Sequence, residues 1–402
     1  MPTPRVSVLM TTYNGAATIG ASIDSILAQS FRDFELLVVD DGSTDDTPAI
    51  LDRIRDSRLR LLRAGSRGGI VAARSHGFAA AQGHYIAPLD HDDLSDTERL
   101  AREVAFLDAN PDVVLVASEI RIVREGGVAA PHHPTAGDAL ALRWLFLIDN
   151  PLTWSSVMFR ADAVHRLGSF LRPEFELADD FDFYHRLLGV GAIARLDEVL
   201  TTYRYHAANA SLARAEALNA NAARVLCRAY APWLGEAAAT AAELVVRHLS
   251  DRQPVPDAAT LDRIGWILER LLEQFSAAQD LSVADRRRIG GLAGEAWWRT
   301  ARGAIRRGAP GMFGPYRARK ALTADFHPAV GDAAASLAVG TVRRVLATLG
   351  AARDGAGFAD APEGEQPNDP APPGGFAAFG HLGEREDDQG HADEDHAPRR
   401  PG

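Results

Sequence analysis

The residues best suited to chemistry follow an apolar run at positions 85–89, where the chain reads Asp90-His91-Asp92-Asp93. Asp90 and Asp92 are carboxylates one residue apart. Mg²⁺ prefers oxygen ligands and usually keeps only one or two carboxylates beside substrate phosphates. The pair therefore predicts a divalent cation held between this loop and a bound diphosphate. The alternative is a solvated acidic turn that caps the next helix.

A second acidic loop, Asp40-Asp41-Gly42-Ser43, follows the apolar run 34–39. A carboxylate at the end of a strand can accept a hydrogen bond from a base edge or a ribose hydroxyl. The same residue types also favour helix N-caps. Both roles are compatible, because one residue can cap while its neighbour binds.

A third acidic group, Asp179-Asp180-Phe181-Asp182, lies in a stretch too acidic for a plain core helix. A carboxylate beside a reacting hydroxyl can take its proton as a general base. Neighbouring carboxylates raise one another's pKa, which suits that role. The alternative is a capped, solvent-facing first turn of a helix.

Cationic side chains complete the set. Arg204 can pair with phosphate through its planar fork, and His206 can be a further metal or phosphate ligand, although a lone histidine is more often structural. Arg74, after Gly68-Gly69, is another phosphate candidate, with a surface arginine as the alternative.

These residues need elements that bring them together. Short apolar runs predict strands at 5–10, 34–39, 59–62, 85–89, 113–117 and 196–204. Helical spacing predicts helices at 18–29, 70–82 and 138–149. This alternation predicts an α/β fold with a mostly parallel sheet, which binds ligands outside the carboxyl ends of its strands. Thr11–Asn14, Asp40–Ser43 and Asp90–Asp93 would then converge on one crevice.

Composition divides the chain into three parts. Residues 1–212 have the α/β pattern, and residues 213–350 are rich in Ala, Leu and Arg and predict a helical region. Residues 351–402 are rich in Gly, Pro, Asp and Glu, and so few apolar side chains predict a disordered acidic tail.

Bulk properties exclude several classes of protein. The 402 residues are 46% hydrophobic and 24% charged, as in soluble globular proteins. The net charge of −11 comes mainly from residues 354–402, which hold 12 Asp and Glu against 3 Arg, so no basic nucleic-acid-binding domain is expected. A single cysteine, Cys227, excludes an intramolecular disulfide.

The chain shows neither a signal peptide nor a transmembrane run, which predicts a cytoplasmic protein. Residues 286–320 carry 10 Lys and Arg against 1 Glu, interleaved with Trp297-Trp298 and Tyr316. Such a stretch can rest on an anionic bilayer, which would place the protein peripherally at the inner face of the cell membrane. The alternative is an ordinary helical subdomain with a solvated basic face.

Five stretches, taken in order, resemble glycosyltransferase family 2, an inverting family with the GT-A fold, a Rossmann-like nucleotide-binding domain. They are VSVLMTTYNG (6–15), SILAQSFRDFELLVVDDGSTDDT (25–47), AQGHYIAPLDHDD (81–93), ADDFDFYHRL (178–187) and LTTYRYH (200–206). Residues 213–402 match nothing in the family.

The resemblance implies a nucleoside site at Thr11, Tyr13 and Asp41, with Asp90 near the ribose and metal. It implies that Asp92 binds Mg²⁺ or Mn²⁺ with the diphosphate. The implied donor is a UDP-, GDP- or dTDP-sugar, with UDP favoured. The implied acceptor is a saccharide or a lipid-linked chain in cell-surface polysaccharide or glycolipid synthesis.

Asp180 matches the Asp of the family's Glu-Asp motif, which implies that it is the general base for direct in-line attack with inversion. Asp179 stands where the family has Glu, and Arg74-Ser75 stands where it has Arg-Asn. We expect Arg74 to contact the nucleotide, and Asp179 and Arg204 to contact the acceptor or phosphate.

Two other functions remain open. A sugar nucleotidyltransferase often has a Gly-rich N-terminal loop followed by Lys or Arg, which the stretch TTYNGAAT lacks. A non-catalytic nucleotide-sugar-binding scaffold would not need Asp92 or Asp180, yet both are present.

Overall fold

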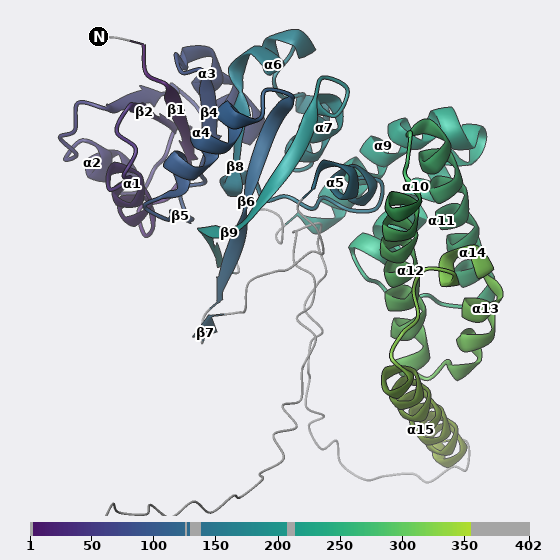
Figure 1. Ribbon diagram of the computed structural model, residues 1–402. Helices are drawn as coiled ribbons and strands as arrows, with labels where there is room; N and C mark the ends of the chain where they lie inside the picture. Colours follow the sequence, from purple (N-terminus) through teal and green to yellow (C-terminus); the bar gives the residue numbers. More distant parts are fainter. Residues whose placement is uncertain (1–2, 125–126, 129–137, 207–213, 355–402) are drawn as a thin grey trace, which may run out of the picture.

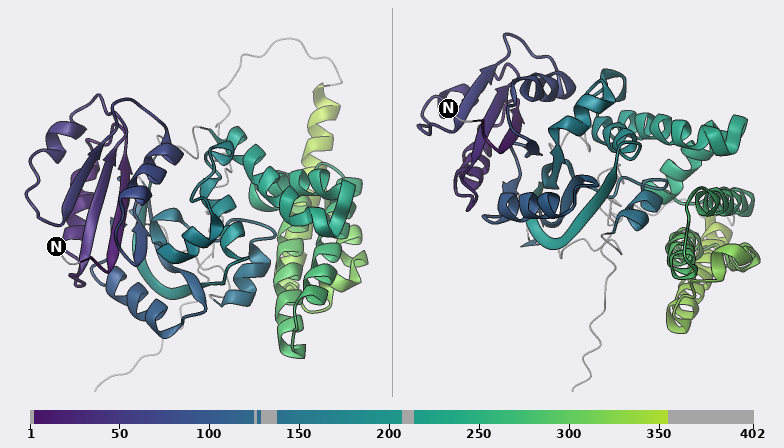
Figure 2. Two further views of the ribbon diagram at one scale, coloured as in Figure 1. Left: turned by 90° about the horizontal axis from the view of Figure 1, so that it is seen from above. Right: turned by 45° about the horizontal axis from the view of Figure 1, so that its top comes forward.

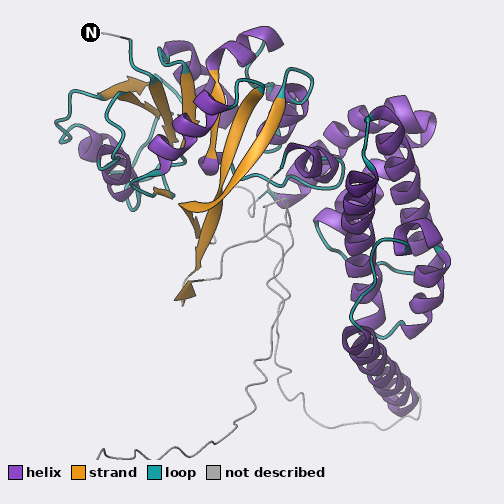
Figure 3. Cartoon of the chain, viewed as in Figure 1, coloured by secondary structure: helices purple, strands orange, loops and turns teal. Residues whose placement is uncertain are grey.

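The computed structural model describes residues 3–124, 127–128, 138–206 and 214–354 (Figure 1). The strands lie in the N-terminal part, and the part from Ala215 onward is helical among the residues described (Figure 3). The predicted fold class, an α/β domain followed by a helical region, is confirmed. The tail was predicted to be disordered over residues 351–402, but residues 351–354 are the end of a helix, and residues 355–402 lie outside the described residues.

The first half of the sheet is parallel and has the order β3-β2-β1-β4. Its strands are β1 (Val6–Thr12), β2 (Phe34–Asp40), β3 (Leu59–Arg63) and β4 (Tyr85–Pro88). Every residue of β1 and β2 is buried, because helices cover both faces of a parallel sheet. These four strands were predicted to within two residues.

The second half of the sheet is mixed and continues in the order β8-β6-β9-β5. Its strands are β5 (Leu94–Ser95), β6 (Val113–Arg124), β7 (Gly127–Val128), β8 (Val157–Arg160) and β9 (Ala192–Tyr205). β8 runs antiparallel to both β4 and β6, whereas β6 and β9 are parallel. Figure 2 shows β9 sweeping in an arc, and its register against β6 shifts along the strand. The antiparallel strands β5, β7 and β8 have two to four residues and were not predicted.

The helices of the α/β part are α1 (Ile19–Leu27), α2 (Thr47–Leu51), α3 (Ile70–Ala80), α4 (Arg99–Ala109), α5 (Ala139–Leu145), α6 (Ala161–Leu167) and α7 (Asp179–Leu187). α1 and α4 pack on one face of the sheet, and α3, α5, α6 and α7 pack on the other. The helix predicted at 138–149 ends at Leu145. A further turn would end at Asp149, next to Asn150, which precedes Pro151 and is therefore disfavoured in helical conformation.

The helical region contains α9 (Ala215–Leu234), α10 (Ala238–Val245), α11 (Ala258–Ala278), α12 (Val283–Arg306), α13 (Phe313–Ala318), α14 (Lys320–Thr323) and α15 (Val330–Asp354). Its core is continuous with the face of the sheet that carries α5 and α7. The rings of Trp144 and Phe275 lie 5.5 Å apart across the junction, and the Tyr230 hydroxyl donates to the Leu147 carbonyl. The helical region is therefore packed against the α/β part.

The aromatic side chains of residues 286–320 belong mostly to this core. Trp297, Trp298 and Tyr316 are at most 5% exposed. The Trp297 indole N–H donates to the Tyr316 carbonyl at 3.1 Å, and that of Trp298 donates to Asp332 at 2.9 Å. The predicted bilayer contact therefore loses the aromatic side chains on which it depended. None of the helices in the described ranges is long and apolar enough to cross a membrane.

Candidate functional site

The loops that follow β1, β2 and β4 meet at one edge of the sheet, as predicted. The Asn14 backbone N–H donates to Ser43 Oγ at 2.9 Å, and Asn14 Oδ1 accepts from the Thr44 N–H at 2.8 Å. The ring of His91 packs directly on Gly15, where an added Cβ would lie only 2.3 Å from His91 Cδ2. Glycine is therefore needed at this crossing of the first and third loops.

Asp41 holds the loop that leads into α3. Its two carboxylate oxygens accept the backbone N–H groups of Gly68 and Gly69, each at 2.8 Å. Gly69 has φ +89°, a left-handed conformation that glycine adopts without strain. The carboxylate predicted to contact the nucleoside thus also fixes the glycine pair that precedes Arg74.

Two other residues predicted to contact the nucleoside lie at the carboxyl end of β1. Thr11 is the second-last residue of strand β1 and is buried. The Tyr13 ring is partly exposed and lies 3.9 Å below the guanidinium carbon of Arg67. An aromatic ring with a cation over its face is a surface on which a planar base can stack.

Arg74 is a buried bridge between two acidic segments. Its Nη1 donates to Asp179 at 2.8 Å, its Nη2 donates to Asp90 at 3.0 Å, and its guanidinium lies 4.4 Å over the Trp154 ring. Burial lowers the pKa of Arg74, but the carboxylates of Asp90, Asp179 and Asp180 outweigh it and raise that pKa above its ordinary value. The guanidinium of Arg74, predicted to contact the nucleotide, is therefore paired with carboxylates of the protein itself.

Asp180 is the more accessible of the two adjacent acids on α7. Its Oδ2 accepts from the Asn150 side-chain amide at 3.0 Å, and its Oδ1 accepts from the Phe181 N–H at 2.7 Å. Burial, followed by the charge of Asp179, raises the pKa of Asp180 to about 7, against the opposing charge of Arg74. A carboxyl group with that pKa can accept a proton near neutral pH.

Asp179 differs from its neighbour, because its side chain is only 2% exposed and is paired with Arg74. Residues next to each other on a helix point about 100° apart, so the side chains of Asp179 and Asp180 have different surroundings. The proposed contact of Asp179 with an acceptor or phosphate would need this carboxylate to leave Arg74.

Arg204 fastens the Asp90–Asp93 loop to β9 and α1. Its backbone N–H donates to Asp93 at 3.0 Å, and its guanidinium donates to the Asp92 carbonyl and to Ser22 Oγ. Two residues later, His206 Nε2 lies 3.0 Å from Asp92 Oδ2. The end of β9 therefore places an imidazole beside the carboxylate that is predicted to bind metal, and Arg204 holds the backbone of the same loop.

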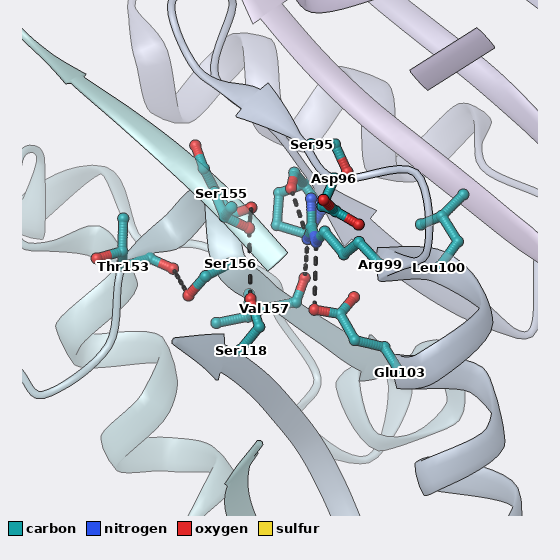
Figure 4. Close-up of polar contacts among 12 residues, drawn as sticks. Ser95, Asp96, Arg99, Leu100, Glu103, Ser118, Thr153, Ser155, Ser156 and Val157 are labelled. Carbon is teal, nitrogen blue, oxygen red and sulfur yellow. Dashed lines mark hydrogen bonds and ion pairs between the residues drawn. The ribbon is translucent and has the colours of Figure 1, made fainter. Parts of the chain in front are cut away.

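Buried polar side chains hold the Asp90–Asp93 loop and the strand before it, and the sequence analysis did not identify them. Ser155 Oγ accepts from the Asp90 backbone N–H at 3.0 Å. Arg99 donates to the carbonyls of Pro88, at 3.1 Å, and Val157, at 2.8 Å, and pairs with the fully buried Glu103 (Figure 4). These contacts fix the end of β4 immediately before the acidic loop. The only sequence signal for Arg99 and Glu103 is that two charged residues stand at helix positions that would otherwise be apolar.

The acidic loop fits a divalent cation only together with a bound ligand. Within the described ranges, no group of three or more His, Cys, Asp or Glu side chains is arranged to hold a metal. Asp92 and His206 offer two donors, and one oxygen of Asp90 is taken by Arg74. Mg²⁺ and Mn²⁺ accept such a sparse set when phosphate oxygens and water complete the shell.

Comparison with curated proteins finds similarity over the α/β part. The chain is 27% identical over 214 residues to an uncharacterized glycosyltransferase of Haemophilus influenzae, covering 50% of this chain and 66% of that one. It is 35% identical over 182 residues to the succinoglycan biosynthesis protein ExoO of Rhizobium meliloti, covering 43% of this chain and 48% of that one.

A third relative is the UDP-Glc:alpha-D-GlcNAc-diphosphoundecaprenol beta-1,3-glucosyltransferase WfaP of Escherichia coli. It is 36% identical over 103 residues, which cover 26% of this chain and 41% of that one. The chain therefore spans less than two thirds of the length of each of these three relatives.

Among solved structures, that of S. aureus TarS with UDP-GlcNAc has a TM-score of 0.48 at 18% identity, covering 83% of this chain and 90% of that one. The sequence model of Glycosyl transferase family 2 matches residues 7–168. That match, together with the relatives above, shows that residues 7–168 of this chain belong to glycosyltransferase family 2.

Proposed function

We propose that this chain transfers a sugar from a nucleotide diphosphate donor to a hydroxyl acceptor, with inversion at the anomeric carbon. The observation that carries the proposal is the Arg74 bridge, which joins Asp90 to Asp179. One guanidinium holds the acidic loop after β4 beside the first turn of α7. This neighbourhood supports a phosphate-binding role for the loop and a general-base role for the acids of α7.

Asp180 is the proposed general base. Its carboxylate takes the proton of the acceptor hydroxyl while the hydroxyl oxygen attacks the anomeric carbon of the donor. The bond from that carbon to the diphosphate oxygen breaks, and the electron pair leaves with the nucleoside diphosphate. The pKa of about 7 supports the role, because the group is partly ionised at neutral pH and still basic enough to accept the proton.

Asp92, with Asp90 and His206, would hold Mg²⁺ or Mn²⁺ together with the donor diphosphate. The bound cation supplies positive charge that neutralises the leaving diphosphate. Arg204 supports this role by holding the Asp92 backbone and the neighbouring Asp93 side chain.

Thr11, Tyr13 and Asp41 are the proposed nucleoside contacts. A UDP-sugar donor is supported by the E. coli relative, whose name specifies UDP-Glc and a lipid-linked diphosphate acceptor. A role in surface polysaccharide synthesis is supported by the name of the R. meliloti relative. The proposed acceptor is accordingly a saccharide or a lipid-linked saccharide.

A thermal-shift panel of UDP, GDP, dTDP and CDP, each with and without Mn²⁺, tests the donor site. A ligand at 100 times its dissociation constant stabilises the fold by about 2.7 kcal/mol. We expect a Mn²⁺-dependent shift with one nucleotide, UDP first, that disappears in Asp92→Ala and persists in the surface control Asp112→Ala. No shift with any nucleotide would refute the donor site.

The matching nucleotide-sugar is then incubated with saccharide and lipid-linked acceptors, and the product is analysed by NMR. A product of inverted anomeric configuration supports the mechanism, whereas a retained configuration contradicts it.

A further inference from the structure

Asn150 lies between α7 and the helical region and is 5% exposed. Its amide nitrogen donates to Asp180 Oδ2 at 3.0 Å, and its amide oxygen accepts from the Leu152 N–H at 3.3 Å. The second contact fixes the orientation of the amide, so that the NH₂ group faces the carboxylate. An amide held in this way donates to the ionised form of Asp180.

The residue before Asn150 connects it to the helical region. Asp149 Oδ1 accepts from the Asn150 backbone N–H at 2.8 Å and from Ser250 Oγ at 2.5 Å. Ser250 is 101 positions away along the chain, in the segment that follows α10. One carboxylate oxygen thus joins the turn that carries Asn150 to a hydroxyl of the helical region.

The segment that presents Ser250 has irregular backbone geometry. Residues Val246–Ser250 form a π-helix, closed by the Asp251 N–H donating to the Val246 carbonyl at 2.8 Å. Arg252 then has φ +55°, a left-handed conformation that is costly for a residue with a Cβ. Short π-helices and strained residues of this kind concentrate at functional sites, where surrounding contacts maintain them.

Charge supports the same contact. Burial raises the pKa of Asp149, and Ser250, Arg252 and Arg299 oppose that rise. Arg299 lies on α12, so the Asp149 carboxylate faces two cations from separate segments of the helical region. Removing this carboxylate would leave two arginines close together without their shared counter-charge.

We infer that Asn150 is a positioning residue for Asp180, and that the helical region fixes Asn150 through the contact between Ser250 and Asp149. The inference rests on the proposed function, in which Asp180 is the general base. The helical region, which the family model does not match, is then part of the apparatus that activates the acceptor.

The electrostatics set the expected effect. Asp180 faces Asp179 and Tyr184 from α7, Arg74 from α3, and Asn150. A hydrogen bond to an ionised group favours ionisation, so its loss raises the pKa of Asp180. We expect Asn150→Ala to move the acidic limb of kcat upward by about one pH unit, since such a bond is worth roughly one to two pKa units. The donor KM should stay unchanged, because the proposed nucleoside contacts lie at another part of the edge.

The experiment compares kcat and donor KM from pH 5.5 to 9 in wild type, Asn150→Ala, Ser250→Ala and the control Ser276→Ala on α11. We expect a smaller upward shift in Ser250→Ala than in Asn150→Ala and none in Ser276→Ala. The nucleotide-induced thermal shift confirms that each variant is folded. If the acidic limb of kcat in Asn150→Ala stays at the wild-type pH, the positioning role of Asn150 is overturned.

If Asn150→Ala fails to fold, Ser250→Ala decides, and an unmoved limb in that variant overturns the link to the helical region. Absence of transfer by the wild-type enzyme refutes the proposed function itself, and is thereby distinguished from failure of this inference.

Discussion

Arg74 and Asp179 lie 105 positions apart and form an ion pair of 2.8 Å in which neither side chain is more than 6% exposed. The same guanidinium holds Asp90 at 3.0 Å, and Asp180 is adjacent to Asp179. One cation thus balances a group of acids that would otherwise repel one another. The arrangement explains why α3, α7 and the acidic loop are found together.

Arg74→Met should lower the free energy of unfolding by about 3–5 kcal/mol, because it leaves buried carboxylates without their partner. Urea unfolding at pH 7.5 measures the change. The control is Arg55→Met, since the exposed Arg55 guanidinium donates to the nearby backbone carbonyls of Asp52 and Ile54. A loss below about 1 kcal/mol, the usual contribution of an exposed pair, would contradict the bridging role.

Asp180→Asn should lower kcat by about 10²–10⁴-fold, the usual contribution of a general base, because the amide cannot accept the acceptor proton. Nucleotide binding should persist, since no proposed donor contact is removed. Single-turnover transfer and the nucleotide thermal shift measure the two properties. The matched control is Asp162→Asn, whose carboxylate is 75% exposed on α6. Equal losses in both variants would rule Asp180 out as the base.

The kcat of the wild-type enzyme should rise with pH and level off above about pH 7, where Asp180 becomes ionised. Stability has the opposite dependence for this group. Its folded-state pKa lies above the unfolded value, so its contribution is present at low pH and is lost as pH rises through about 7. A kcat that is flat from pH 5.5 to 8.5 would contradict the assignment.

Glu103 should make stability depend on pH through a separate group. Burial raises its pKa from 4.5 to about 7, against the charge of Arg99, so the folded state binds its proton more tightly than the unfolded state. Between pH 5 and pH 8, the free energy of unfolding of the wild type should fall by about 2.5 kcal/mol more than that of Glu103→Gln. Urea unfolding at both pH values measures the difference, with exposed Glu98→Gln as control. Equal falls in the free energy of unfolding of the wild type and Glu103→Gln would disprove the raised pKa of Glu103.

Gly15→Ala should weaken both the fold and donor binding, because the new methyl group would collide with His91 and Thr12. Overpacking of this kind costs about 1–3 kcal/mol. Gly20→Ala is the matched control, since nothing lies within 4 Å of its added Cβ in α1, and it should stabilise by about 0.5–1 kcal/mol. Thermal unfolding with and without the nucleotide compares them, and tolerance of Gly15→Ala would refute the close packing of these loops.

The parallel half of the sheet could be predicted from the sequence because its strands are buried on both faces. Continuous apolar runs such as those of β1 and β2 have few alternatives to a buried strand. The short antiparallel strands could not be predicted, since two to four residues carry too little periodicity to be distinguished from loop. β8 acquires its strand conformation from β4 and β6, which are distant in the chain.

Sequence by itself determined the α/β class, the three converging loops and the acids suited to metal binding and proton transfer, because burial patterns and functional-group chemistry are local properties. Tertiary structure decided which partner each side chain takes. It paired Arg74 with Asp179, placed Asn150 on Asp180 and put Trp297 in the core. These outcomes depend on which distant groups become buried together, because a charge taken out of water needs a counter-charge wherever the chain brings one.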